Sequence, residues 1–296
     1  LTPHLQTSCS EAATPSRRNF SQSKQTSTSM MTTDRRFSCL AGGACVAALF
    51  FFLSSAPSAA AHVAWTTGTS MNSWSAVASS SDGNQLFAVN RVEAFTIYKS
   101  ANGGASWEST AVSNPYGYSF LDVTTSADGV YGAVLMSRGL FATADSGVTW
   151  TQTRDIGAGS YRAIVVSGTG QELVVGMYCG TLTYSHDFGV SWNNPFTGLQ
   201  EFVTDIAATP DFSKLVAVTA DGGGSCSSNS EVHISLDGGV EWTQVVSYDF
   251  SGYANGLFAV AISDDGMNIF VGGRYSYMIK SVDGGGNWTR VTSSDG

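Results

Sequence analysis

Charged residues and prolines are scarce in this sequence. Charged residues make up 12% of the 296 residues and prolines number six, whereas glycine, serine, threonine and aromatic residues are abundant. This composition is typical of an all-β domain with many turns. Basic residues are scarcest after residue 61. Residues 1–61 carry five Lys/Arg and two Asp/Glu, whereas residues 62–296 carry nine Lys/Arg and 21 Asp/Glu, a net charge of −12. We therefore expect no nucleic-acid partner, because no basic excess is available to neutralise phosphates.

Several signatures of catalysis and cofactor binding are also absent. The sequence has no metal-ligand cluster, no phosphate-binding glycine loop and no Gly-x-Ser-x-Gly nucleophile turn. His186 lies within a turn motif and His233 within a predicted strand, so we interpret both histidines as structural. We expect no catalytic residue, no cofactor and no metal ion.

Cysteine is rare beyond residue 61. Cys9, Cys39 and Cys45 precede that point, and only Cys179 and Cys226 follow it. Because these two lie in equivalent loops of adjacent repeats, they could form a disulfide in an exported protein. Two free thiols are the alternative, and the sequence does not decide between them.

The first 34 residues lack the apolar residues that a core requires. Residues 1–30 contain 12 Ser/Thr, three basic residues and one acidic residue. We expect residues 1–34 to be a disordered Ser/Thr-rich leader. A transit peptide is one interpretation, and translated upstream sequence before a start at Met30 or Met31 is the other.

A single apolar run, Cys39–Leu53, follows the basic pair Arg35-Arg36 and precedes Ala59-Ala60-Ala61. This order predicts a signal peptide or lumenal targeting segment over residues 35–61, cleaved before His62. An uncleaved membrane anchor is the alternative, although the run is short for a span. Either way we expect export from the cytosol, to the extracellular space or to the thylakoid lumen. Phe37 follows the arginine pair directly, which departs from the usual twin-arginine spacing.

One turn motif, Ser/Thr-x-Asp/Asn-x-Gly-x-x-Trp, occurs five times at nearly even spacing. Its tryptophans are 43, 42, 50 and 46 residues apart, which indicates a repeat architecture. The acid or amide and the following Gly favour a tight turn, and the Trp begins the next strand. The copies are Ser100–Trp107, Thr143–Trp150, Ser185–Trp192, Ser235–Trp242 and Ser281–Trp288.

Each copy is preceded by two short apolar stretches that flank an Asp-Gly turn or a related turn. We therefore predict four short strands per repeat, two around this turn and two around the motif. The paired stretches are Trp74–Val77 with Leu86–Val89, Phe120–Val123 with Val130–Val134, Tyr161–Val166 with Leu173–Val175, Val203–Ala208 with Leu215–Val218, and Leu257–Ile262 with Ile269–Val271.

The turn motif resembles the Asp box, or bacterial neuraminidase repeat, of β-propeller proteins. The resemblance implies an all-β propeller of four-stranded blades over residues 62–296, with the Asp boxes as structural hairpins on the rim. It assigns structural roles to Asn102, Trp107, Asp145, Trp150, Asp187, Trp192, Asp237, Trp242, Asp283 and Trp288.

The number of blades stays open. Five blades are visible, and Ala64-Trp65-Thr66-Thr67 resembles the fourth strand of a repeat. In propellers such a strand often completes the last blade. We therefore expect either a truncated form of a six- or seven-bladed ring or a five-bladed ring.

The loops opposite the motif hairpins are where we expect binding residues. Three arginines in equivalent loops could converge on an anionic partner, because a guanidinium recognises carboxylates in bidentate fashion. The alternative is that each arginine covers its own loop. The candidate binding residues are Arg91, Arg138, Arg274, Tyr275 and Tyr178.

Among Asp-box proteins, the short blades and the leader are most similar to the photosystem II assembly and stability factors. That resemblance implies a non-catalytic scaffold that binds a protein, specifically a membrane-protein precursor. A sialidase-like glycoside hydrolase is an alternative, but no Arg-Ile-Pro motif stands before the first box and no paired carboxylates can be assigned. A carbohydrate-binding or cell-surface module is a third interpretation, with a glycan as partner.

Overall fold

The computed structural model describes residues 37–38, 74–90, 96–112, 119–137, 139–155, 161–177, 181–196, 202–220, 229–249, 256–273 and 277–291. The chain divides into two compact units, residues 1–30 and 31–296, and all described residues belong to the second. The predicted leader, the targeting segment apart from Phe37–Ser38, and Ala64–Thr67 lie outside the described residues.

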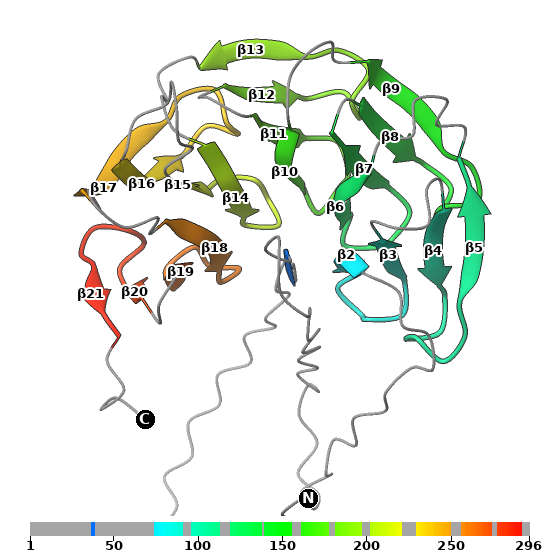
Figure 1. Ribbon diagram of the computed structural model, residues 1–296, viewed down its shortest axis with the longest axis horizontal. Coiled ribbons are helices and arrows are strands. Elements are labelled where there is room, and N and C mark those ends of the chain that lie inside the picture. Colours follow the sequence, from blue (N-terminus) through cyan, green and yellow to red (C-terminus); the bar gives the residue numbers. More distant parts are fainter. Residues whose placement is uncertain are drawn as a thin grey trace, which may run out of the picture. The chain divides into compact units, whose positions relative to one another are not determined.

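The described residues form five antiparallel sheets, each built from four consecutive strands (Figure 1). This arrangement confirms the predicted all-β propeller fold. Sheet 1 also pairs with a two-residue strand, β1 (Phe37–Ser38). No described helix is long and apolar enough to cross a membrane. Sheet 1 contains β2 (Trp74–Ser79), β3 (Leu86–Asn90), β4 (Thr96–Ser100) and β5 (Glu108–Ala111), and sheet 2 contains β6 (Phe120–Thr125), β7 (Gly132–Met136), β8 (Gly139–Thr143) and β9 (Thr151–Asp155). Sheet 3 contains β10 (Tyr161–Val166), β11 (Leu173–Met177), β12 (Leu182–Ser185) and β13 (Asn193–Phe196), and sheet 4 contains β14 (Phe202–Ala208), β15 (Leu215–Ala220), β16 (Asn229–Ser235) and β17 (Thr243–Asp249). Sheet 5 contains β18 (Leu257–Ile262), β19 (Ile269–Gly273), β20 (Met278–Ser281) and β21 (Thr289–Arg290).

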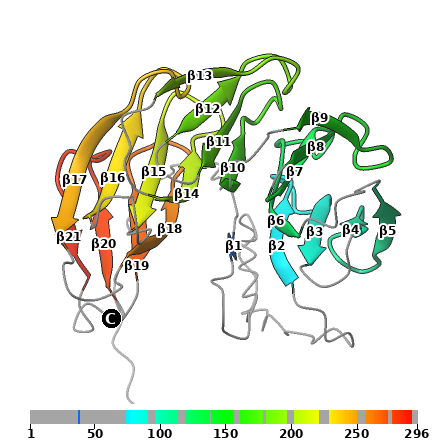
Figure 2. The ribbon, with the colours of Figure 1, turned by 45° about the horizontal axis from the view of Figure 1, so that its top comes forward.

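Apolar side chains fill the spaces between successive sheets, because both faces of most inner strands carry them. The strands β2, β6, β10, β14 and β18 contact one another in chain order, and the fourth strand of each sheet lies farthest out (Figure 2). Four buried clusters occupy the four interfaces. Phe87 and Phe120, for example, both belong to the cluster between sheets 1 and 2.

The turns between the first and second strands form a backbone ladder across four sheets. The N–H of Ser81 donates to the carbonyl of Ala127 at 2.8 Å, Ala127 donates to Gly168 at 2.9 Å, and Gly168 donates to Pro210 at 2.7 Å. Pro210 has no N–H, so it cannot continue the ladder to sheet 5. The side chain of Lys214 makes the link instead: its Nζ donates to the carbonyls of Gly266 and Gly284 in sheet 5, at 3.0 and 3.1 Å.

Two buried aspartates also join adjacent sheets. In all five sheets the first strand pair has a β-bulge, and the residue that follows it occupies an equivalent position. Sheets 2 and 4 carry Asp122 and Asp205 at this position. The Oδ2 atom of Asp122 accepts the N–H of Ile164 in sheet 3 at 3.1 Å. Sheets 1, 3 and 5 have alanine at the corresponding position.

Candidate functional site

The predicted binding residues all belong to loops that join the second and third strands of a sheet. Arg91, Arg138, Tyr178, Arg274 and Tyr275 lie outside the described residues, as do Cys179 and Cys226 of the predicted disulfide. Whether the arginines converge therefore stays a prediction. The described part of the chain contains no group of three or more His, Cys, Asp or Glu that could hold a metal ion.

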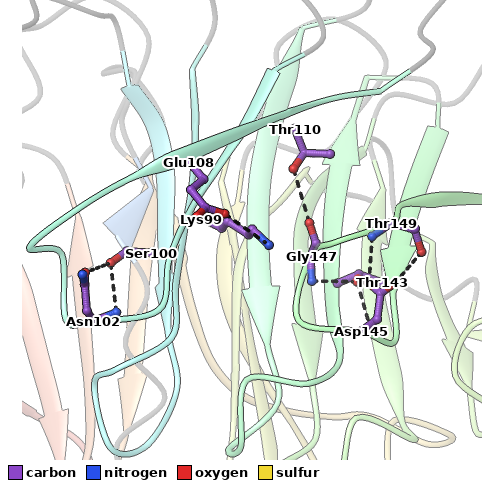
Figure 3. Close-up of polar contacts among 9 residues, drawn as sticks. All are labelled: Lys99, Ser100, Asn102, Glu108, Thr110, Thr143, Asp145, Gly147 and Thr149. Carbon is purple, nitrogen blue, oxygen red and sulfur yellow. Dashed lines mark hydrogen bonds and ion pairs between the residues drawn. The ribbon is translucent and has the colours of Figure 1, made fainter.

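The motif copies form hairpin turns between the third and fourth strands. In each turn the Ser or Thr hydroxyl donates to the acid or amide two residues later, at 2.8 to 3.0 Å. The same hydroxyl accepts the N–H of the motif Gly, as Thr143 does from Gly147 at 2.9 Å (Figure 3). One side chain thus satisfies both ends of the turn, which explains why the sequence requires a hydroxyl there.

The motif acid holds the residue that precedes the Trp. Asp145 Oδ1 accepts the N–H of Thr149 at 2.8 Å, and Oδ2 accepts the Thr149 hydroxyl at 2.7 Å (Figure 3). In the first copy, Asn102 makes the same backbone contact with Ser106 at 2.8 Å and donates its amide to the Ser106 hydroxyl. Asn and Asp are therefore interchangeable in this geometry, but only Asp titrates.

Hydrogen bonds lower the pKa of three motif aspartates to about 2. For Asp145 the main donor is the Thr149 side chain, and for Asp187 it is the Ser191 side chain. For Asp283 it is the backbone N–H of Asn287. Donors to the charged form favour that form, so these carboxylates are ionised throughout the neutral range.

The fourth position of the motif, between the acid or amide and the Gly, adopts a left-handed backbone in all five copies. Glycine occupies it in three copies, but Ser146 and Phe188 occupy it with φ of 55° and 60°. A bulky residue with positive φ is uncommon and strained. The Phe188 side chain is 40% exposed and lies 4.7 Å from the ring of Tyr131, centroid to centroid. Sequence reasoning missed both aromatic residues, although Phe at a position that favours Gly was a usable signal.

A cavity of about 310 Å³ lies at the interface of sheets 2 and 3, beside these rings. The cavity lies where one cross-strand pair of sheet 2 has small side chains. In each sheet this pair, here called the rim pair, consists of the residue before the motif Ser/Thr and its partner on the preceding strand. The rim pairs of sheets 1 to 4 are Phe87–Lys99, Ala133–Ala142, Val174–Tyr184 and Val216–Ile234.

Rim pairs pack under the motif Gly of the next sheet. A Cβ on Gly147 would meet Phe87 at 2.6 Å, and one on Gly239 would meet Val174 at 2.7 Å. A Cβ on Gly189, which follows the alanine rim pair of sheet 2, would meet nothing closer than 3.5 Å. The two alanines therefore leave space where the other sheets are filled.

Sheet 5 presents a largely apolar face that no other described sheet covers. Ala261 pairs with Phe270, and Gly272 pairs with Ala259 and Met278, which places all five residues on one face. The half-buried Lys280, which also pairs with Phe270, lies on the same face. Phe270 is 44% exposed and Met278 43% exposed, and both alanines are exposed. In sheet 4 the corresponding positions, such as Ala207, Val216 and Val232, are buried against sheet 5.

Comparison with known proteins finds likeness in structure alone. No family model matches the sequence, and no curated protein matches it. A GH74 xyloglucanase from Xanthomonas campestris superposes with a TM-score of 0.56 at 16% identity, over 71% of this chain and 37% of that one. YCF48 from Cyanidioschyzon merolae superposes with a TM-score of 0.51 at 15% identity, over 71% of this chain and 69% of that one. A chain of a nidogen/laminin complex superposes with a TM-score of 0.51 at 11% identity, over 72% of this chain and 77% of that one.

These likenesses are at the level of the fold. The chain spans less than two fifths of the length of the xyloglucanase. Identities of 11 to 16% are too low to transfer a substrate or a partner. The conclusion that the comparisons support is a β-propeller built from four-stranded sheets.

Proposed function

We propose that this chain is an exported, non-catalytic β-propeller that binds a protein partner, in the manner of the photosystem II assembly and stability factors that its turn motif resembles. The proposal is supported by the resemblance of the turn motif, together with the largely apolar face of sheet 5 that no other described sheet covers. Contiguous apolar surface of this kind marks interaction sites in soluble proteins. A propeller chain within a nidogen/laminin complex is a precedent for this fold in a protein assembly.

The chemistry of the face indicates what it binds. In each of the four preceding interfaces, the same face is covered by apolar side chains of an adjoining β-sheet. On sheet 5, Ala259, Ala261 and Gly272 leave room for large side chains, and Met278 adapts to irregular ones. We therefore infer that apolar side chains of a partner pack on this face, and from the resemblance of the turn motif we propose that they belong to a membrane-protein precursor.

Location and binding test this proposal together. We expect the tagged full-length protein to reside in the thylakoid lumen of its native cell, with a mature N-terminus near His62. Newly synthesised photosystem II subunits should co-purify with it. Phe270→Asp should reduce their recovery at least fivefold, because it places a charge on the apolar face. Val282→Asp, at a 64% exposed position of a motif hairpin, is the matched control. Secretion to the medium, or equal recovery with Phe270→Asp, would overturn the proposal.

Glycoside hydrolysis is the second candidate function, and the likeness to a xyloglucanase is what favours it. Incubation of the purified protein with xyloglucan and with a fluorogenic sialoside tests it. Turnover that Arg274→Ala abolishes would replace the scaffold proposal with a hydrolase. Glycan binding without turnover would instead favour the carbohydrate-binding interpretation.

A further inference from the structure

The rim pair of sheet 5 repeats the rim pair of sheet 1. Lys280 precedes the motif Ser281 and pairs with Phe270 on the preceding strand, in the same way as Lys99 pairs with Phe87. The three sheets between them have rim pairs without a charged residue. The surroundings of the two Phe–Lys pairs differ, because Phe87 is fully buried whereas Phe270 is 44% exposed.

The rim pair of sheet 1 holds the motif hairpin of sheet 2. The Phe87 ring meets the Trp150 ring edge to face, with 5.5 Å between the centroids. A Cβ on Gly147 would lie 2.6 Å from Phe87 and 3.5 Å from Lys99 Cδ, so this glycine packs directly on the pair. The Thr110 hydroxyl adds a hydrogen bond to the Gly147 carbonyl at 3.4 Å (Figure 3). A Phe–Lys rim pair therefore fits the Gly and the Trp of an adjoining motif hairpin.

Sheet 5 carries such a pair on the face that no other described sheet covers. Phe270 and the half-buried Lys280 lie on this face together with the exposed Met278. Val291 takes the place of Thr110, three residues after the motif Trp, so this surface lacks the hydroxyl that sheet 1 has. The likeness to sheet 1 indicates that a motif hairpin would fit on Phe270 and Lys280 through apolar contact.

The motif hairpin of sheet 1 has no preceding described sheet on which to pack. In the other four hairpins the motif tryptophan packs in the apolar cluster between its own sheet and the preceding one. Trp107 of sheet 1 is instead 43% exposed. The nearest atom to a Cβ on Gly104 would belong to Leu86 of the same sheet, at 3.4 Å, whereas a Cβ on Gly239 would meet Val174 of the preceding sheet at 2.7 Å. The Gly and the Trp of this hairpin are therefore available to another surface.

The two ends of the described series of sheets thus complement each other. We propose that two copies of this chain associate head to tail, with the sheet 1 hairpin of one copy packed on Phe270 and Lys280 of the other. Gly104 lies on this rim pair as Gly147 lies on that of sheet 1, and Trp107 anchors the contact. Because two different surfaces meet, each pair of copies keeps one free hairpin and one free rim pair, so longer assemblies can form.

This association uses the face that the proposed function assigns to a precursor, but it does not depend on that assignment. The second copy covers the apolar face when no other partner is bound. A precursor that binds there competes with the second copy for Phe270. Trp107 separates the two interactions, because only the self-association uses it.

Analytical ultracentrifugation of the protein, purified from its native cells and free of other subunits, tests the proposal. The average mass of the wild type should rise with concentration above that of one chain. Phe270→Asp and Trp107→Asp should each weaken self-association at least tenfold, because each places a charge in an apolar contact. Val190→Asp, at an 80% exposed position in the motif hairpin of sheet 3, is the matched control and should associate like the wild type.

A mixture of the two variants distinguishes a head-to-tail contact from other arrangements. Phe270→Asp keeps an intact hairpin and Trp107→Asp keeps an intact rim pair, so an equimolar mixture should form a one-to-one dimer and nothing larger. If an aspartate prevents folding, Phe270→Ala and Trp107→Ala remove the rings without adding a charge and should behave in the same way.

Three results would overturn the proposal. The first is a wild-type mass of one chain at every concentration, as expected if a single chain closes on itself. The second is a folded Trp107→Asp variant that associates like the wild type, which would indicate that sheet 5 pairs with itself. The third is a mixture of two folded variants that forms no dimer. Recovery of precursors is a separate measurement, which Trp107→Asp should not reduce, so either proposal can fail without the other.

Discussion

Asp205 in sheet 4 holds Val260 in sheet 5 by a buried hydrogen bond. Its Oδ2 atom accepts the N–H of Val260 at 2.9 Å, while Oδ1 accepts the N–H of Ile206 at 2.9 Å. Asp205 is 6% exposed, so both bonds form away from water. The carboxylate thereby fixes the innermost strand of one sheet against that of the next, as Asp122 does between sheets 2 and 3.

We predict that Asp205→Ala lowers the free energy of unfolding by about 2–3 kcal/mol, because two buried N–H groups lose their acceptor. Alanine stands at this position in sheets 1, 3 and 5, so the substitution fits the backbone. Urea unfolding measures the change. Glu108→Ala, at a 77% exposed side chain, is the control and should change stability by less than about 0.5 kcal/mol. An unchanged urea midpoint for Asp205→Ala would show that the two hydrogen bonds of Asp205 do not stabilise the fold.

Lys214 replaces the ladder bond that Pro210 cannot donate. Lys214→Met keeps the apolar stem but removes both hydrogen bonds to sheet 5, so we expect a loss of about 2 kcal/mol. Lys99→Met is the matched control, since Lys99 forms a 3.7 Å ion pair with the exposed Glu108. Its loss should stay under about 1 kcal/mol. Equal effects of the two variants in urea unfolding would contradict the bridging role.

Gly147 packs against a large rim-pair side chain, Phe87, whereas Gly189 has open space above the alanine rim pair of sheet 2. Both have positive φ, of 76° and 81°, so alanine costs about 1–2 kcal/mol at either place. A Cβ on Gly147 would also overlap Phe87, which adds about 1–3 kcal/mol. Thermal unfolding should therefore rank Gly147→Ala clearly below Gly189→Ala. The reverse order would show that the space under Gly189 is not open.

Acid should destabilise the motif hairpins over a defined range. The pKa of Asp145, Asp187 and Asp283 is about 2 in the folded protein and about 3.9 in an unfolded chain. The lowered pKa contributes stability that is fully present above about pH 4 and is lost as the pH falls to about 2. Carboxyl NMR titration measures the three pKa values directly. A triple Asp→Asn variant, which copies Asn102, should show less loss of stability between pH 4 and pH 2 than the wild type.

Strand positions were predictable from the sequence because they depend on local patterns. The stretches Tyr161–Val166 and Leu257–Ile262, for example, coincide with β10 and β18. The prediction began β7 at Val130, whereas the strand begins at Gly132, because Val130 belongs to the turn and its N–H binds Asp128.

The cavity was not predictable in the same way. The cavity exists because the small side chain of Ala142 in sheet 2 faces Gly189 in sheet 3. The sequence around Ala142 does not indicate that these two residues lie near each other. The hydrogen bond from Asp205 to the next sheet was likewise not predictable, because it depends on the strand register that the β-bulge sets. Long-range packing of this kind is set by which residues meet, and a single sequence does not state it.

Site-specific photo-crosslinking from residue 270 probes the apolar face of sheet 5 in the cell. A photoreactive residue replaces Phe270 in the full-length protein, and a second protein carries it at Val282 as the control. We expect, in native cells, an adduct with a membrane-protein precursor from position 270 and none from position 282. No adduct from position 270, or the same adducts from both positions, would contradict a protein-binding function for the apolar face of sheet 5.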